Sequence, residues 1–268
     1  MGKVLNQLNF YLGKNSSLIL LSLIYSICCV ILFYSAQQSE FISIIFPYSI
    51  AFVAYILMYY LFNPSYHIKL IIFLALLVRV TSLFYFPHLS NDIYRFWWDG
   101  ELINSGINPF NYTPKQIMDL ELIRGETVKL CFDKMNSPEY FTVYPPLCQL
   151  LFSICSKISG ENLYLFSLLL KITFFITEIF SFKYFNRLLK ITNSSPKILF
   201  LIFLNPLLIL ECYGNLHFEI ILINFLIISI VYLYESKMLH SGFALGISAI
   251  SKLTSLILVP FYILKNIK

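Results

Sequence analysis

Apolar residues in this chain form long runs, and the polar residues gather in the segments between them. A membrane-spanning helix needs about 20 apolar residues, with a lower limit of about 17. Most of the runs reach or approach that length, and they cover 17–35, 41–62, 70–86, 163–184, 198–210, 218–234 and 241–263. The pattern predicts an all-α, polytopic membrane helical bundle of about seven spans.

Three apolar runs depart from a simple crossing. The run at 147–158 is too short to span, so we interpret it as a re-entrant or interfacial helix. The run at 198–210 is also short, and it reaches Tyr213 only by taking Glu211 into the membrane edge. The last run, 241–263, contains Lys252, which leaves two alternatives: a single crossing, or a broken helix that turns near this lysine.

The placement of lysine and arginine predicts the orientation, because basic residues concentrate in cytoplasmic loops. Lys3 and Lys14 place the N-terminus in the cytoplasm, and three crossings then place a large loop, 87–146, on the outer face. If 147–158 does not cross, the next span returns the chain to the cytoplasm at a basic cluster of Lys183, Arg187, Lys190 and Lys197. The same count returns 213–217 to the outer face.

Composition agrees with a single integral membrane domain over 1–268 in a cell membrane. Of the 268 residues, 58% are hydrophobic and only 12% are charged, and the mean hydropathy is +0.75. The net charge of +5 comes from basic residues in short loops beside the spans, so we expect lipid and no nucleic acid as a partner. Six cysteines show no CxxC spacing, which predicts small buried side chains rather than a disulfide or metal set.

The large loop begins with a segment rich in carboxylates and aromatic rings, which we expect to form an amphipathic helix. Asn91 can cap a helix that starts at Asp92, and Gly106 followed by Pro109 would end it. On such a helix Asp92, Arg95 and Asp99 share one face, because their spacings are three and four. One interpretation is a helix lying on the membrane, with Trp97 and Trp98 as interfacial anchors.

A functional interpretation of this helix makes one carboxylate a general base and Arg95 a phosphate-binding group. A base must reach the hydroxyl that it deprotonates, and the planar guanidinium of arginine matches phosphate oxygens. Aromatic faces such as that of Trp98 also suit the apolar patches of sugar rings.

Other polar residues outside this helix add candidates. Two prolines in 142–147 force an extended entry into the short run that follows. Three titratable residues meet in nine positions, Glu211, His217 and Glu219, and the missing CxxC argues against zinc there. Ionisable residues inside apolar runs are functional candidates by default, and these are Arg79, Lys171, Glu178 and Lys252.

These motifs, taken in order, resemble the GT-C membrane glycosyltransferases, with the closest likeness to bacterial mannosyltransferase-like members related to the catalytic subunit of GPI mannosyltransferase I. The resemblance rests on Asn91-Asp-Ile-Tyr-Arg95, Trp98-Asp-Gly100, Gly106-Ile-Asn-Pro-Phe110, Tyr144-Pro-Pro-Leu147-x-Gln149, Asn205-Pro206, Gly214-Asn-Leu-His217-Phe-Glu219 and Ser251-Lys-Leu253. It covers the chain from about residue 70 to its end. The ordered set is specific for the superfamily and not for one sugar.

The resemblance implies a polyprenyl-phosphate sugar as donor, a glycan or lipid as acceptor, and inversion at the anomeric carbon. Asp92 or Asp99 would be the base, with the motif order favouring Asp92, and Arg95 and Lys252 would stabilise the donor phosphate. The substrate would be bound by Trp98, Tyr144, Glu211, His217 and Glu219. The resemblance specifies no cofactor and allows a divalent cation, whose expected ligands are either Asp92 and Asp99, or Asp99 with His217 and Glu219.

Two features keep a second function in view: the length of the chain, and the ionisable residues of its apolar runs, which are Arg79, Lys171, Glu178 and Lys252. Members of this family usually continue through further spans, so we expect this chain to be an N-terminal module, a truncated product or a short divergent member. The alternative function is a non-catalytic membrane protein, either an inactive relative or a transporter-like binding module. A transporter places its ionisable groups near the bilayer midplane, whereas most acids here lie in the outer loop, which favours the enzyme.

Overall fold

The computed structural model describes the backbone of residues 2–266 and the side chains of residues 15–263. All the secondary structure in this described part is helical, which confirms the predicted fold class. The chain divides into two compact units, Met1–Leu89 with Ser194–Gly214, and Ser90–Asn193 with Asn215–Lys268. Each unit is therefore described separately.

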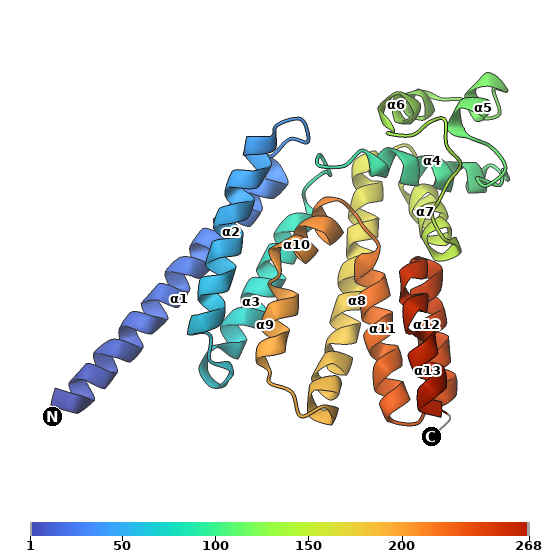
Figure 1. The fold of residues 1–268 in the computed structure, drawn as a ribbon. Helices are drawn as coiled ribbons and strands as arrows, with labels where there is room; N and C mark the ends of the chain where they lie inside the picture. Colours follow the sequence, from blue (N-terminus) through green and yellow to red (C-terminus); the bar gives the residue numbers. More distant parts are fainter. Residues whose placement is uncertain (1, 267–268) are drawn as a thin grey trace. The chain divides into compact units, whose positions relative to one another are not determined.

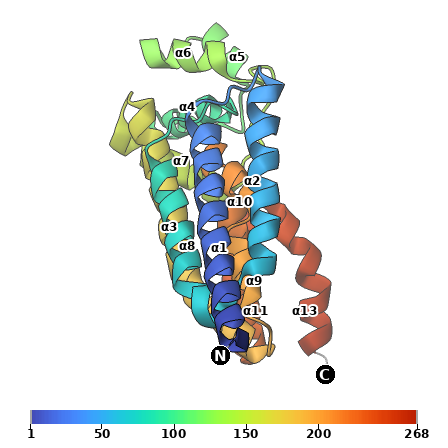
Figure 2. The same cartoon turned by 90° about the vertical axis from the view of Figure 1, so that its left-hand side faces the viewer.

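The first unit contains the N-terminal spans. Its helices are α1 (Gly2–Tyr34), α2 (Phe41–Leu61), α3 (Pro64–Leu83), α9 (Lys197–Phe203) and α10 (Pro206–Ile209), followed by a π-helical turn, η1 (Leu210–Gly214). Figure 2 shows α1 and α2 running along one another. The short run at 198–210 is lengthened by η1, which gives an 18-residue apolar segment that includes Glu211.

Arg79 lies buried on α3 in this first unit, and its hydrogen bonds explain how the apolar span accommodates it. Its Nη1 atom donates to the carbonyl oxygens of Ala75 at 3.0 Å and Phe203 at 2.8 Å. The guanidinium also lies 5.7 Å from the ring centres of Phe203 and Tyr213. Arg79 thus satisfies backbone carbonyls near the break between α9 and α10, which is a structural role.

The second unit contains the large loop and the C-terminal helices. Its helices are α4 (Asp92–Asn104), α5 (Pro114–Asp119), α6 (Glu126–Lys134), α7 (Pro146–Ser159), α8 (Leu163–Ile191), α11 (Glu219–Tyr234), α12 (Met238–Ser251), a 3-10 helix η2 (Leu253–Leu258), and α13 (Val259–Asn266). Figure 1 shows α5 and α6 beyond α4, at the end of the unit where α8 begins.

Five segments of the described chain are long and apolar enough to cross a membrane, and four shorter apolar helices accompany them. The prediction of about seven spans included α11 and α12, which have 16 and 14 residues. At 1.5 Å per residue these helices are about 24 Å and 21 Å long, against a hydrocarbon core of about 30 Å. The broken-helix alternative for the last run is the correct one, because α12 ends at Ser251 and Lys252 is extended.

Serine hydroxyls join α11 to α12, and these are the contacts by which short helices can associate in lipid. Ser229 Oγ donates to the Ser241 carbonyl at 2.7 Å, and Ser241 Oγ donates to the Ser229 carbonyl at 2.9 Å. Ser248 Oγ reaches the Leu222 carbonyl at 2.9 Å. Beyond Lys252 the chain turns, and α13 runs back toward the end of the unit where α11 and α12 connect (Figure 1).

Candidate active site

Helix α4 carries the predicted site residues and is itself almost wholly buried. It begins at Asp92 and ends at Asn104, with Gly106 at a positive φ of 78°, as the sequence predicted. The cap differs from the expectation: the Asn91 side chain makes no capping hydrogen bond, and Ser90 Oγ accepts from the Asp92 amide at 3.2 Å instead.

The two tryptophans of α4 are interior residues. Trp97 and Trp98 are 2% and 0% exposed, and Trp97 Nε1 donates to the Gly160 carbonyl at 2.8 Å. They therefore do not anchor α4 in a lipid interface, which corrects that interpretation. Trp98, which the sequence assigned to substrate binding, packs against Phe132 and lines neither of the cavities described below.

Asp92 is the partly exposed carboxylate of α4. Its side chain is 29% exposed, and its Oδ2 atom lies 3.5 Å from His217 Nε2. Asn136 Nδ2 approaches the other carboxylate oxygen, also at 3.5 Å. The hydrogen bond from His217 lowers the pKa of Asp92, outweighing the effect of partial burial, so the group is ionised at neutral pH.

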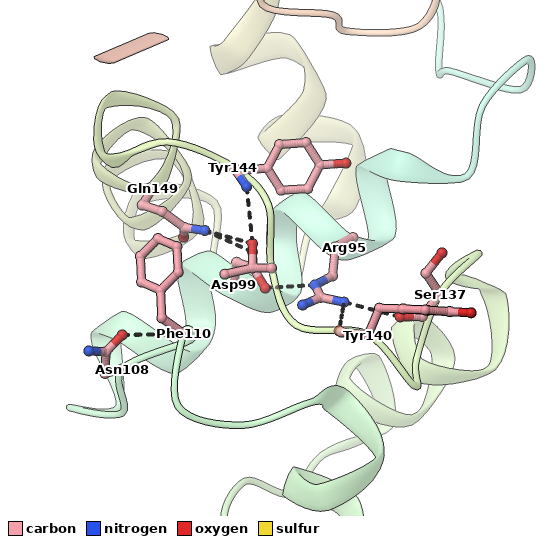
Figure 3. Close-up of polar contacts among 9 residues, drawn as sticks. Arg95, Asp99, Asn108, Phe110, Ser137, Tyr140, Tyr144 and Gln149 are labelled. Atoms are coloured by element: carbon pink, nitrogen blue, oxygen red, sulfur yellow. Dashed lines mark hydrogen bonds and ion pairs between the residues drawn. The ribbon is translucent and has the colours of Figure 1, made fainter. Parts of the chain in front are cut away.

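Asp99 lies two turns further along the same helix face and is fully buried. Figure 3 shows its carboxylate at the centre of a closed set of donors. Arg95 Nε donates to Oδ1 at 2.8 Å, while Thr142 Oγ1 and Gln149 Nε2, the latter at 2.9 Å, donate to Oδ2. Burial raises the pKa of Asp99, and these three neighbours oppose that rise.

The guanidinium of Arg95 forms hydrogen bonds with other groups of the protein. Besides Asp99, it donates through Nη1 to the carbonyl oxygens of Ser137 at 3.2 Å and Tyr140 at 3.1 Å (Figure 3). Its side chain is 9% exposed. These bonds connect α4 to the segment 137–144, which we call the strap. The predicted contact of Arg95 with a donor phosphate stays a prediction.

A cavity of about 450 Å³ opens beside Asp92. Its wall gathers four of the other predicted site residues. His217 and Glu219 come from the start of α11, Lys252 from the break after α12, and Tyr144 from the strap. Tyr144 contributes the aromatic wall. Lys252 Nζ forms an ion pair with Glu219 Oε1, and the second carboxylate oxygen of Glu219 is buried without a hydrogen-bond partner.

A second cavity, of about 350 Å³, lies on the strap side of Asp92. Asp92, Val143 and Tyr144 line both cavities. The smaller one alone is lined by Arg95, Asn136 and four other strap residues, Ser137, Tyr140, Phe141 and Thr142. Among the described carboxylates, Asp92 alone lines both cavities.

Several residues of this site were missed by the sequence analysis. Asn136 carries no pattern that distinguishes it from an ordinary loop residue. Thr142 and Gln149 lie within the motif at 142–149, but that motif assigns no role to either side chain. Phe96 and Phe218 line the larger cavity, and their rings meet at 88° with centres 6.1 Å apart. The only signal for these two was their position beside Arg95 and between His217 and Glu219.

Two further predictions concern residues outside this group. Glu211 lies in η1, in the first unit, so its assignment to substrate binding stays a prediction. The part of the chain that the structure describes holds no group of three His, Cys, Asp or Glu side chains placed to bind a metal ion. Asp99 is fully enclosed by its donors, so the pair Asp92 and Asp99 does not fit a shared divalent cation.

The sequence profile of a family described as "alpha-(1->6)-mannopyranosyltransferase, N-terminal domain" matches residues 29–268. The chain belongs to this family. The match covers every candidate residue described above, and it identifies the protein as a membrane glycosyltransferase of a mannosyltransferase family. No curated protein and no solved structure matches the chain.

Proposed function

We propose that this chain transfers mannose from a polyprenyl-phosphate donor to a glycan or lipid acceptor at the outer face of the membrane. The family description supports mannose and an α-(1→6) linkage. The lipid-linked donor is inferred from the resemblance to GT-C enzymes. Helix α8, which is long and apolar enough to span a membrane, belongs to the same unit as both cavities. The outward orientation is inferred from the basic cluster at the other end of α8, which the positive-inside rule places in the cytoplasm.

In the proposed reaction, the acceptor hydroxyl oxygen attacks the anomeric carbon of mannose. The bond between that carbon and the phosphate oxygen breaks, the phosphate leaves with the electron pair, and Asp92 takes the hydroxyl proton. A single displacement inverts the anomeric centre, so an α product requires a β-linked donor. Asp92 fits the role because it is ionised at neutral pH and is accessible from both cavities.

Lys252 is the group that we assign to the leaving phosphate. It lies on the wall of the larger cavity at the break after α12, where its neighbour Ser251 also lines the wall. A positive charge placed where negative charge develops stabilises the transition state. Glu219 holds the ammonium in place before the donor binds. His217 and Tyr144 are left to contact the sugar.

The observation that carries this proposal is the position of Asp92 as the one described carboxylate shared by both cavities. The test is transfer of labelled mannose from polyprenyl-phosphate mannose by the purified protein in lipid. Asp92→Asn should lower kcat by roughly 10²–10⁴-fold, the usual contribution of a general base. Asp119→Asn is the matched control, because Asp119 is an exposed carboxylate of the same loop.

Activity of the Asp92→Asn variant equal to that of the Asp119→Asn control would contradict the assignment of the base. Absence of transfer by the unmodified protein would contradict the proposed donor, and binding of labelled polyprenyl phosphate would then distinguish a non-catalytic binding protein from an enzyme with another donor.

A further inference from the structure

The strap, 137–144, begins with a turn at 138–139 and continues without regular secondary structure, and it contributes to the walls of both cavities. It lacks helix or strand hydrogen bonds along most of its length. Val143, at 81% exposure, and Tyr144 form the wall that the two cavities share beside Asp92. A segment without its own secondary structure needs outside contacts to hold one position.

Buried charges of α4 supply three of those contacts, and α5 adds a hydrogen bond from the Lys115 amide to the Pro138 carbonyl oxygen at 3.0 Å. Arg95 donates to two carbonyl oxygens at the start of the strap, those of Ser137 and Tyr140. Asp99 accepts from the Thr142 hydroxyl in its middle. Gln149, from α7, donates to both Asp99 and Thr142, at 2.9 Å and 3.0 Å.

This arrangement lowers the stability of the folded protein unless every hydrogen-bond partner is present. A fully buried carboxylate requires compensation by a charge and by hydrogen bonds, and removing one partner leaves the others uncompensated. All three donors to the Asp99 carboxylate make hydrogen bonds in the observed arrangement. That arrangement fixes the strap relative to α4, two turns from Asp92 on the same helix face.

We propose that Asp99 and Thr142 are positioning residues, through which α4 holds the strap where it separates the two cavities beside Asp92. Neither residue lines the larger cavity, where the donor is proposed to bind; Thr142 lines the smaller cavity, and Asp99 lines neither. This inference rests on the proposed function for its effect on transfer. Its effect on the strap itself is independent of any activity.

Hydrogen–deuterium exchange on the full-length protein in lipid tests the positioning directly. Asp99→Asn removes the charge while keeping the shape, so exchange at the backbone amides of 139–144 should become faster, while exchange in α11 stays unchanged. Asp92→Asn, which removes the proposed base, should leave strap exchange as it is. Unchanged strap exchange in Asp99→Asn would overturn the proposal.

Transfer kinetics give the second measurement. If the strap is displaced, its part of the cavity wall moves and the substrates are misaligned. A misplacement of reacting groups by about 1 Å lowers the rate by on the order of 10²-fold. We therefore expect kcat/KM of Asp99→Asn to fall by roughly that factor. If the unmodified protein shows no transfer, the proposed function fails, and the exchange experiment alone still decides the positioning role.

If the Asp99→Asn variant does not fold, two substitutions of Thr142 test the same proposal. Thr142→Ser keeps the hydroxyl and should retain the strap exchange rates of the unmodified protein and near-normal kcat/KM, whereas Thr142→Val removes it and should show faster exchange. Glu139→Gln is a control on the strap itself, because its ion pair with Lys115 is exposed on both sides and contributes little. Equal exchange in Thr142→Ser and Thr142→Val would overturn the proposal.

Discussion

At the scale of single residues, the protein separates two aspartates that look equivalent along the sequence. Asp92 and Asp99 lie on one face of α4, seven residues apart. Asp92 is partly exposed beside His217, while Asp99 is enclosed by Arg95, Thr142 and Gln149. The sequence could place both on one helix face, but it could not show which of them a substrate reaches, because that depends on residues far away in the chain.

The pH dependence of transfer provides a residue-scale prediction. Asp92 must be ionised to act as base, and its pKa is lowered by His217, so kcat/KM should fall only when the pH drops through a value below the ordinary pKa of aspartate. His217→Ala removes the largest cause of that lowering, so the acid limb of the kcat/KM profile should move to higher pH. An acid limb that stays in place or moves to lower pH would contradict this role of His217.

At the scale of elements, α4 and α7 approach one another closely at Gly100. A Cβ atom at this position would lie 2.4 Å from the Phe152 carbonyl oxygen and 2.6 Å from Ser156 Oγ. The sequence predicted both helices and their lengths, including the short α7, from periodicity and helix-ending residues. It did not predict that the two helices would pack at this glycine. A glycine within a helical pattern cannot be assigned from sequence either to an open surface or to a contact with the backbone of another helix.

A substitution at this glycine tests the close approach. Gly100→Ala must push backbone atoms apart, so we expect it to destabilise the protein by about 1–3 kcal/mol, the usual cost of overpacking. Gly246→Ala in α12 is the control, because no atom lies within 4 Å of its added Cβ and alanine favours helix by up to about 1 kcal/mol. Thermal unfolding of both variants in detergent measures the difference; similar melting temperatures would show that α4 and α7 are free to move apart.

At the scale of the whole molecule, the helices display apolar side chains outward, as lipid contact requires. Isoleucine, leucine and phenylalanine side chains are exposed along α1, α2 and α3. All six cysteines are free and buried, as the sequence predicted. The orientation in the membrane is predicted from the placement of basic residues alone, so it requires an experimental test.

Labelling with a membrane-impermeant thiol reagent tests the orientation. Lys129 on α6 and Lys190 near the end of α8 are both exposed. In intact cells Lys129→Cys should react, and Lys190→Cys should react only after the membrane is permeabilised. The buried native cysteines keep the background low. The reverse pattern would place the cavities on the cytoplasmic side.

The sequence by itself determined the helical membrane class, the start of α4 at Asp92 and the set of motifs that carries the family likeness. The length, hydropathy and local spacing of these segments depend only on residues that are neighbours in the sequence, so they can be determined without the folded structure. Only the tertiary structure decided that Asp92 is accessible, that Asp99 is enclosed, that Trp98 is interior and that Lys252 meets Glu219 at a helix break. These outcomes depend on burial and on partners more than thirty residues apart, which only packing brings together.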